Sequence, residues 1–249
     1  MTQLRIGVIC EGPTDFHAIR HFMAPALDQH GVKASFIDIQ PDMGRTLPEG
    51  GWGNVELWLK NNPPKLRIQS YFDGGLFQRN LSSKACDLFL LQMDSDILDD
   101  ESFISHMRND YGIEIAKILD HVERGRRISD VLKLWSNVKA LTQVDSRRHV
   151  FVPAVESTET WCVAAFDNKH QEPENLRGAD LAQAFMEALE QSESRPIQVY
   201  TTVSKDVERR ARFCETHAAG HSRIVERCPH FNSAVTAILK ITRPEGKAT

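Results

Sequence analysis

Short apolar runs separated by polar turns predict four core strands in this chain. The runs cover residues 4–11, 32–40, 87–96 and 149–155. The third run, DLFLLQMDSD, is almost continuously apolar before its acidic end, which is typical of a parallel strand that is buried on both faces. We therefore predict an α/β fold, a mainly parallel, Rossmann-like sheet flanked by helices.

Helical periodicity fills most of the chain between and after these strands. Apolar residues recur every three or four positions from Phe16 to Leu27, which predicts a helix after the first strand. Residues 99–146 predict a helical insertion, and residues 179–241 predict a helical C-terminal part with a break at Cys228-Pro229. Weaker patterns predict a short helix at 55–60, an edge strand at 66–72 and a short extended piece at 196–202.

Acidic residues follow three of the predicted strands. Glu11 follows the first, Asp94 and Asp96 end the third, and Glu156 and Glu159 follow the fourth. Carboxyl ends of parallel strands meet at one edge of a sheet, so we expect these side chains to converge there. Carboxylates held together repel one another unless a cation lies between them, and carboxylate oxygens suit Mg²⁺. The sequence therefore predicts a magnesium site at this edge.

Each carboxylate also has a purely structural interpretation. Asp94 and Asp96 could cap the helix that starts near Asp99. Glu11 could be an ordinary turn residue, and Glu156 could be a charge favoured by the dipole of the following helix. A purely structural role for the acidic residues at all three strand ends is less probable than such a role at any single strand end.

Composition narrows the function without deciding it. The length of 249 residues suits one domain over residues 1–249. The net charge of −4 and pI of about 6.2 exclude a globally basic nucleic-acid binder. Local arginines at 123–127 and 146–148 could line a phosphate path or form solvated helix faces. With no long apolar segment, we expect no membrane span and a cytoplasmic location.

The cysteines and histidines near the C-terminal end raise a second metal hypothesis. The five cysteines are an odd number without a CxxC pair, so reduced thiols are the simplest interpretation. Cys214, His217 and His221 would share one helix face, and Cys228 could complete a zinc site. The spacing matches no established zinc pattern, and helix packing explains these residues equally well.

The order of the motifs resembles that of the TOPRIM fold, the catalytic domain of topoisomerases, bacterial primases and OLD-type nucleases. The resemblance is carried by EGPTD at 11–15, DSD at 94–96 and ESTETW at 156–161, each after an apolar strand, and by Pro229-His230-Phe231 near the end. It is nearest to small stand-alone, OLD-like TOPRIM proteins of bacteria that are associated with ATPases and phage defence.

This resemblance implies a Mg²⁺-dependent nuclease in which Mn²⁺ can substitute. Glu11, Asp94 and Asp96 would bind the metal, and Glu11 could also move a proton. Glu159, or Glu156 as a second choice, would complete a second metal position, and Lys205 would stabilise developing negative charge. The expected substrate is nucleic acid, DNA ahead of RNA, in phage defence or DNA processing.

Two other functions stay open at this point. The chain could be a non-catalytic or partner-gated TOPRIM-like subunit of an ABC/AAA-type ATPase complex, with or without homo-oligomerisation. It could also be a nucleotide-sugar transferase that uses Asp94 and Asp96 as a DxD motif to hold a metal on a diphosphate. The transferase leaves Glu11 and its turn unexplained.

Overall fold

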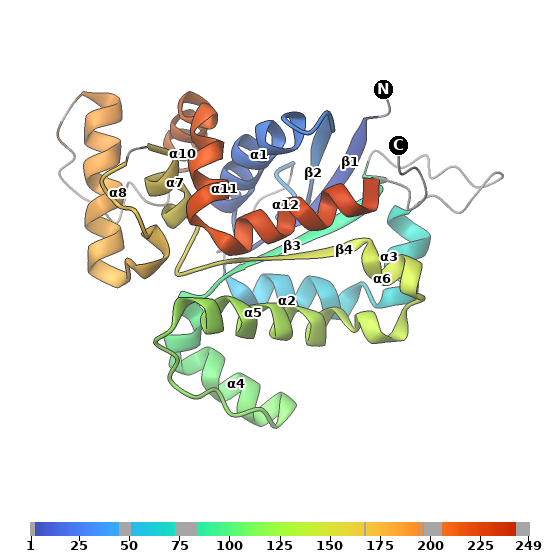
Figure 1. Cartoon of the computed structure of the whole chain (residues 1–249). Helices are drawn as coiled ribbons and strands as arrows, with labels where there is room; N and C mark the ends of the chain where they lie inside the picture. Colours follow the sequence, from blue (N-terminus) through green and yellow to red (C-terminus); the bar gives the residue numbers. More distant parts are fainter. Residues whose placement is uncertain are drawn as a thin grey trace.

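The computed structural model describes residues 3–44, 51–72, 84–166, 168–194, 196 and 206–242. Its four described strands form one parallel sheet in the order β2-β1-β3-β4. They are β1 (Leu4–Ile9), β2 (Ala34–Gln40), β3 (Leu88–Asp94) and β4 (His149–Ala154). The predicted α/β fold, with a parallel sheet flanked by helices, is therefore confirmed (Figure 1).

Strand β3 lies at the centre of the sheet and is buried on both faces. Each residue from Leu88 to Met93 has no exposed surface. Leu88 and Leu90 belong to one hydrophobic core, whereas Phe89, Leu91 and Met93 belong to the other. This alternation follows from the period of two along a strand, and it explains why the run reads as continuously apolar.

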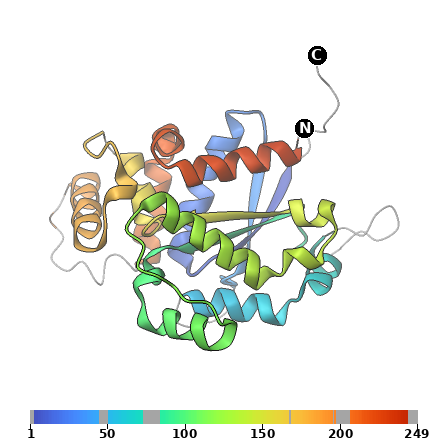
Figure 2. The same ribbon diagram turned by 60° about the horizontal axis from the view of Figure 1, so that its bottom comes forward.

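Helices cover both faces of the sheet. Figure 1 shows α1 (Pro13–Asp28) and α12 (Pro229–Thr242) on one face and α2 (Trp52–Asn61) and α5 (His121–Ser136) on the other. The rotated view in Figure 2 shows the same layers. The remaining elements between β2 and β4 are α3 (Pro64–Tyr71), η1 (Asp96–Asp99), α4 (Glu101–Tyr111), η2 (Val138–Ala140) and α6 (Gln143–Arg147).

Further helices gather at one end of the molecule, beyond β4 (Figure 1). They are α7 (Glu159–Phe166), η3 (Pro173–Asn175), α8 (Gly178–Glu193), α10 (Val207–Thr216), η4 (Ala218–Gly220) and α11 (His221–Arg227). Helix α7 is almost wholly buried and packs against α8 and α11. It therefore links the end of the sheet to the C-terminal helices.

Several predicted elements are confirmed and one is wrong. The short helix predicted at 55–60 lies within α2, and the break at Cys228 separates α11 from α12. An additional break at η4 divides the predicted helix that precedes Cys228 into α10 and α11. The segment 66–72, predicted as an edge strand, is helix α3, because Pro64 suits the first helical position and buried Arg67 bonds the carbonyl oxygens of Asn62 and Ser136.

The predicted helical insertion over 99–146 contains α4, α5 and α6. Helix α5 packs directly on β3 and β4, so part of this stretch forms the layer over one face of the sheet. The extended piece predicted at 196–202 lies outside the described residues, apart from position 196. Among the described helices, none combines the length and apolar character that crossing a membrane requires.

Gly220 tests the packing between η4 and α7. Its φ of −74° suits any residue, but an added Cβ would overlap the backbone of Ala165. We expect Gly220→Ala to lower the free energy of unfolding by about 1–3 kcal/mol. Gly53→Ala is the matched control, because a Cβ at this helical position meets open space and should be neutral or slightly stabilising. Denaturant unfolding measures both; equal stabilities for the two variants would contradict this packing.

Candidate functional site

The carboxyl edge of the sheet brings together acidic side chains from several elements. Glu11 follows β1, and its Oε1 accepts a hydrogen bond from the backbone N–H of Asp94 at 2.8 Å. Asp94 is the last residue of β3, and its Oδ1 accepts a hydrogen bond from Nε2 of buried Gln92 at 2.7 Å. These bonds fix one oxygen of each carboxylate at neighbouring strand ends.

Asp96 reaches the same edge by a different backbone path from the expected one. The strand ends at Asp94, and Asp96 begins η1 with an exposed side chain. Between them, buried Ser95 donates its N–H to the carbonyl oxygens of Ala154 and Glu156 at 2.9 and 3.0 Å. Its Oγ accepts the N–H of Glu156 at 2.8 Å. Ser95 thus joins the ends of β3 and β4.

Asp15 is a site residue that the sequence reasoning missed. It lies in the first turn of α1, is 6% exposed, and accepts a hydrogen bond from Oγ1 of Thr158 at 2.7 Å. It does not cap the helix, because the N-cap is Gly12 and has no side-chain cap bond. The available signal was periodicity, because Asp15 shares the buried face of Ile19 and Phe22, four and seven positions on.

Glu159 forms a buried ion pair at the start of α7. Nη2 of Arg210, from α10, pairs with its Oε1, while Nη1 of Arg210 donates to Oγ1 of Thr158 at 3.3 Å. Burial acts to raise the pKa of Glu159, but the charge of Arg210 and the hydrogen bonds to the carboxylate together outweigh it, and the pKa is lowered. The Arg210 guanidinium also lies 4.6 Å from the ring centroid of Phe185. Arg210 therefore holds Glu159 and supports the Thr158–Asp15 contact.

Glu156 is occupied by partners from its own chain. Its backbone has a positive φ of 59°, and its side chain is buried. Oε1 accepts the N–H of Gly178 at 2.9 Å, and Oε2 lies 3.4 Å from Nη2 of Arg124 and 3.6 Å from Nε of Arg177. With both oxygens engaged, Glu156 stabilises the junction of β4, α5 and α8, and this geometry favours Glu159 over Glu156 as a site residue.

The electrostatics of the edge distinguish Glu11, Asp15, Asp94 and Asp96 from ordinary surface acids. Burial, and then the charge of Asp15, raise the pKa of Glu11 and of Asp94. Burial raises the pKa of Asp15 to about 6 despite the hydrogen bond from Thr158. Although the Asp96 side chain is exposed, partial desolvation by the surrounding protein and the charges of Glu156 and Glu159 raise its pKa to about 7. These four side chains, hereafter the acidic cluster, repel one another.

The chemistry of the acidic cluster fits a hard divalent cation. Its donors are carboxylate oxygens, and in the described part of the chain the charged neighbours acting on Glu11 and Asp94 are other carboxylates. Within the described residues, no three His, Cys, Asp or Glu side chains are already arranged to hold a metal ion. The fit therefore rests on donor type and uncompensated charge. Lys205, predicted to act beside the cluster, lies outside the described residues.

The structure does not place the predicted zinc ligands on one helix face, because Cys214 lies in α10 and His221 starts α11 after the break at η4. Cys214 faces Cys162, and Nε2 of His217 lies 2.8 Å from Oγ of Ser192. Nδ1 of His221 contacts the carbonyl oxygen of Ala218 at 3.0 Å. These local partners replace the common ligand sphere that the helix spacing suggested, in agreement with the lack of a metal-holding group among the described side chains.

The arginines of 123–127 do not form one continuous basic surface. Arg124 is 1% exposed, donates to the carbonyl oxygens of Ser95 and Ile118, and pairs with Asp99. Arg126 is exposed and pairs with Glu123 and Asp130. The predicted phosphate path is therefore wrong for Arg124, which supports the fold beneath the acidic cluster.

Comparisons with known proteins yield no relative. A scan against protein-family profiles, a search of curated proteins and a search of solved structures each return no match. The class that fold and site define is thus an α/β protein with a four-stranded parallel sheet and an acidic cluster at its carboxyl edge.

The raised pKa values predict that stability falls as pH rises in metal-free buffer. Asp15 and Asp96 have pKa values of about 6 and 7 when folded, against about 3.9 when unfolded. The folded chain therefore binds more protons between about pH 4 and pH 7, and the stabilisation present below pH 4 is lost across that interval. We expect the Tm of Asp15→Asn to rise relative to wild type between pH 4 and 7.5.

Differential scanning calorimetry in the presence of a chelator measures this difference. Exposed Asp28→Asn is the matched control and should keep a constant offset from wild type. A pH-independent offset for Asp15→Asn would show that its carboxyl titrates normally.

Proposed function

We propose that this chain is a Mg²⁺-dependent nuclease that hydrolyses phosphodiester bonds of nucleic acid, DNA ahead of RNA. The observation that carries the proposal is the acidic cluster, in which four mutually repelling carboxylates, from the buried Asp15 to the exposed Asp96, are held at the carboxyl edge of a parallel sheet. A protein keeps such charges together at a cost in stability. The resemblance of the motif order to TOPRIM nucleases supports the same activity.

The residues of this edge have separate tasks in the proposed reaction. Mg²⁺ or Mn²⁺ would neutralise charge on the phosphate oxygens and lower the pKa of a bound water. Asp94 and Asp96, with Asp15, would hold the cation. The Asp94 N–H fixes Oε1 of Glu11 and leaves Oε2 to orient a water. Burial and the charge of Asp15 raise the pKa of Glu11, and a raised pKa makes its carboxylate a stronger base.

Glu159 would act at the border of the acidic cluster rather than at its centre. Its ion pair with Arg210 compensates its charge before any cation binds. We therefore propose that Glu159 orders Arg210 and Thr158 around Asp15. It would contribute to a second metal position only if its carboxylate bound Arg210 and the cation at the same time. Lys205 stays a predicted stabiliser of developing negative charge.

The contact between Glu11 and Asp94 favours the nuclease over the transferase. A DxD site for a nucleotide sugar would need Asp94 and Asp96, whereas here the carboxylate that follows β1 binds the β3 backbone directly. A partner-gated subunit is compatible with the same geometry. An ATPase partner, a homo-oligomer and a role in phage defence stay predictions from the resemblance.

The test is Mg²⁺- and Mn²⁺-dependent cleavage of plasmid, single-stranded DNA and RNA by the purified chain. We expect Glu11→Gln and Asp94→Asn each to lower the cleavage rate by on the order of a hundredfold or more, because the first removes the proposed base and the second removes a proposed metal ligand. Asp28→Asn makes the same carboxylate-to-amide change on an exposed helix end and should cleave like wild type.

Isothermal titration calorimetry with Mn²⁺ separates the remaining cases. Metal binding that is weakened by Asp94→Asn, with no cleavage by wild type, would favour the partner-gated subunit. Retained cleavage and retained metal binding in a double Asp94→Asn, Asp96→Asn variant would refute the metal-nuclease proposal.

A further inference from the structure

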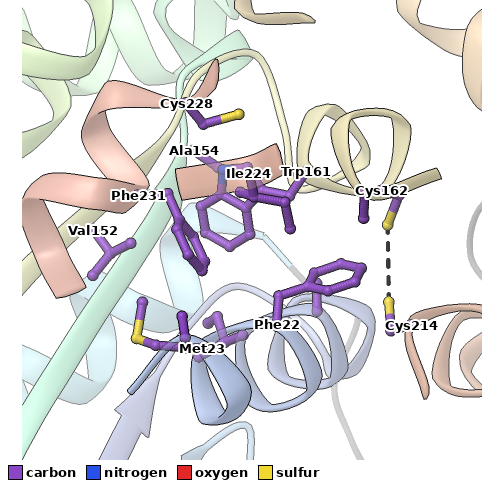
Figure 3. Close-up of a cluster of buried hydrophobic side chains, with 14 of the residues drawn as sticks. Phe22, Met23, Val152, Ala154, Trp161, Cys162, Cys214, Ile224, Cys228 and Phe231 are labelled. Atoms are coloured by element: carbon purple, nitrogen blue, oxygen red, sulfur yellow. Dashed lines mark hydrogen bonds between the residues drawn. The ribbon is translucent and has the colours of Figure 1, made fainter. Parts of the chain in front are cut away.

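Two buried thiols face each other between α7 and α10. The Sγ atoms of Cys162 and Cys214 lie 3.8 Å apart, and neither residue has exposed surface. Figure 3 shows the two side chains pointing toward one another. The two cysteines are 52 positions apart in the chain. Cys86, by contrast, belongs to the core on the other face of the sheet. The contact is therefore a specific pairing of two helices that are distant in sequence.

The thiol pair is the second of two links between these helices. On α7, Cys162 follows Glu159 by three positions, and on α10, Cys214 follows Arg210 by four, so both pairs share a helix face. The Glu159–Arg210 ion pair forms the first link, and the thiols form the second one turn along each helix.

The two sulfur atoms are close enough that covalent closure needs an approach of less than about 2 Å. The separation is 3.8 Å, and a disulfide needs about 2.0 Å. We propose that Cys162 and Cys214 form a dithiol modification site that a two-electron oxidant such as hydrogen peroxide converts into a disulfide between α7 and α10.

The reaction balances without any other participant. One thiolate attacks a peroxide oxygen, the O–O bond breaks, and a sulfenic acid and water form after proton transfer. The second thiol attacks that sulfenic sulfur, the S–O bond breaks, and the hydroxyl leaves as a second water. Two thiols and one hydrogen peroxide thus give one disulfide and two waters.

Burial makes this reaction slow but selective. Burial raises the pKa of Cys214, so the closed protein presents little thiolate. The first step therefore requires α10 to move away from α7. Once one sulfur is oxidised, reclosure places the other sulfur beside it, which favours the pair over links to Cys10, Cys86 or Cys228. A disulfide here would also change the position of α7 and so of Glu159.

Peptide mapping by mass spectrometry tests the proposal on the full-length chain, independently of nuclease activity. The reduced protein is exposed to hydrogen peroxide, quenched with catalase, alkylated and digested without reductant. We expect a Cys162–Cys214 peptide as the main cross-link, the loss of two free thiols per chain, and complete reversal by dithiothreitol. Cys162→Ala and Cys214→Ala should each abolish it, whereas Cys86→Ala should not.

Thermal unfolding provides a second readout that does not depend on digestion. Because the disulfide would constrain the unfolded chain, oxidation should raise the Tm of wild type by on the order of 5–10 °C. The Tm of Cys214→Ala should not rise on oxidation. The proposal is overturned if Cys162 and Cys214 stay alkylatable after the other cysteines have been oxidised, or if cross-links form without preference. A wild-type Tm unaffected by formation of the cross-link would refute the stabilising link.

Discussion

The hydrogen bond from the Asp94 N–H to the Glu11 carboxylate is the contact on which the candidate site depends. It joins the ends of two central strands that are paired in register from Ile6 with Leu88 to Ile9 with Leu91. Because β1 and β3 are hydrogen-bonded neighbours in this register, the backbones at Glu11 and Asp94 stay side by side as long as the sheet is intact. The sheet therefore forces two like charges together, and the neighbouring carboxylates have to be accommodated around them.

A second layer of contacts connects this pair to the C-terminal helices. Thr158 donates to Asp15 and accepts from Arg210, which also pairs with Glu159. Through these bonds α1, α7 and α10 meet at one point, although residues 15 and 210 lie at opposite ends of the chain. An ion pair buried in this way adds little net stability, but losing one partner would leave an uncompensated charge. The Glu159–Arg210 ion pair therefore contributes more to fixing how α1, α7 and α10 meet than to the net stability of the fold.

The sequence was sufficient for the sheet and for part of the acidic cluster. A strand such as β3 is apolar on both faces, so an unbroken apolar run is enough to predict it. Once the strand ends are known, Glu11 and Asp94 are expected at the same edge of the sheet, where they are found. The segment that became α3 was ambiguous because seven residues fit both periodicities. Asp15 and Arg210 were missed because their roles depend on contacts between distant elements. The occupation of Glu156 by Arg124 and Gly178 has the same long-range origin.

Glu156 and Glu11 show that the protein can compensate a buried carboxylate and does so selectively. Both lie just after a strand at the same edge, yet Glu156 is met by two arginines and a backbone N–H. Among the described groups, the charges acting on Glu11 are those of Asp15 and Asp96, which oppose its ionisation. The fold thus places arginines beside the carboxylate after β4 and further carboxylates beside the one after β1. The uncompensated negative charge is therefore confined to the strand end at Glu11. This strand end is where a bound divalent cation would gain most, so the proposed cation would restore stability that is lost in assembling the acidic cluster.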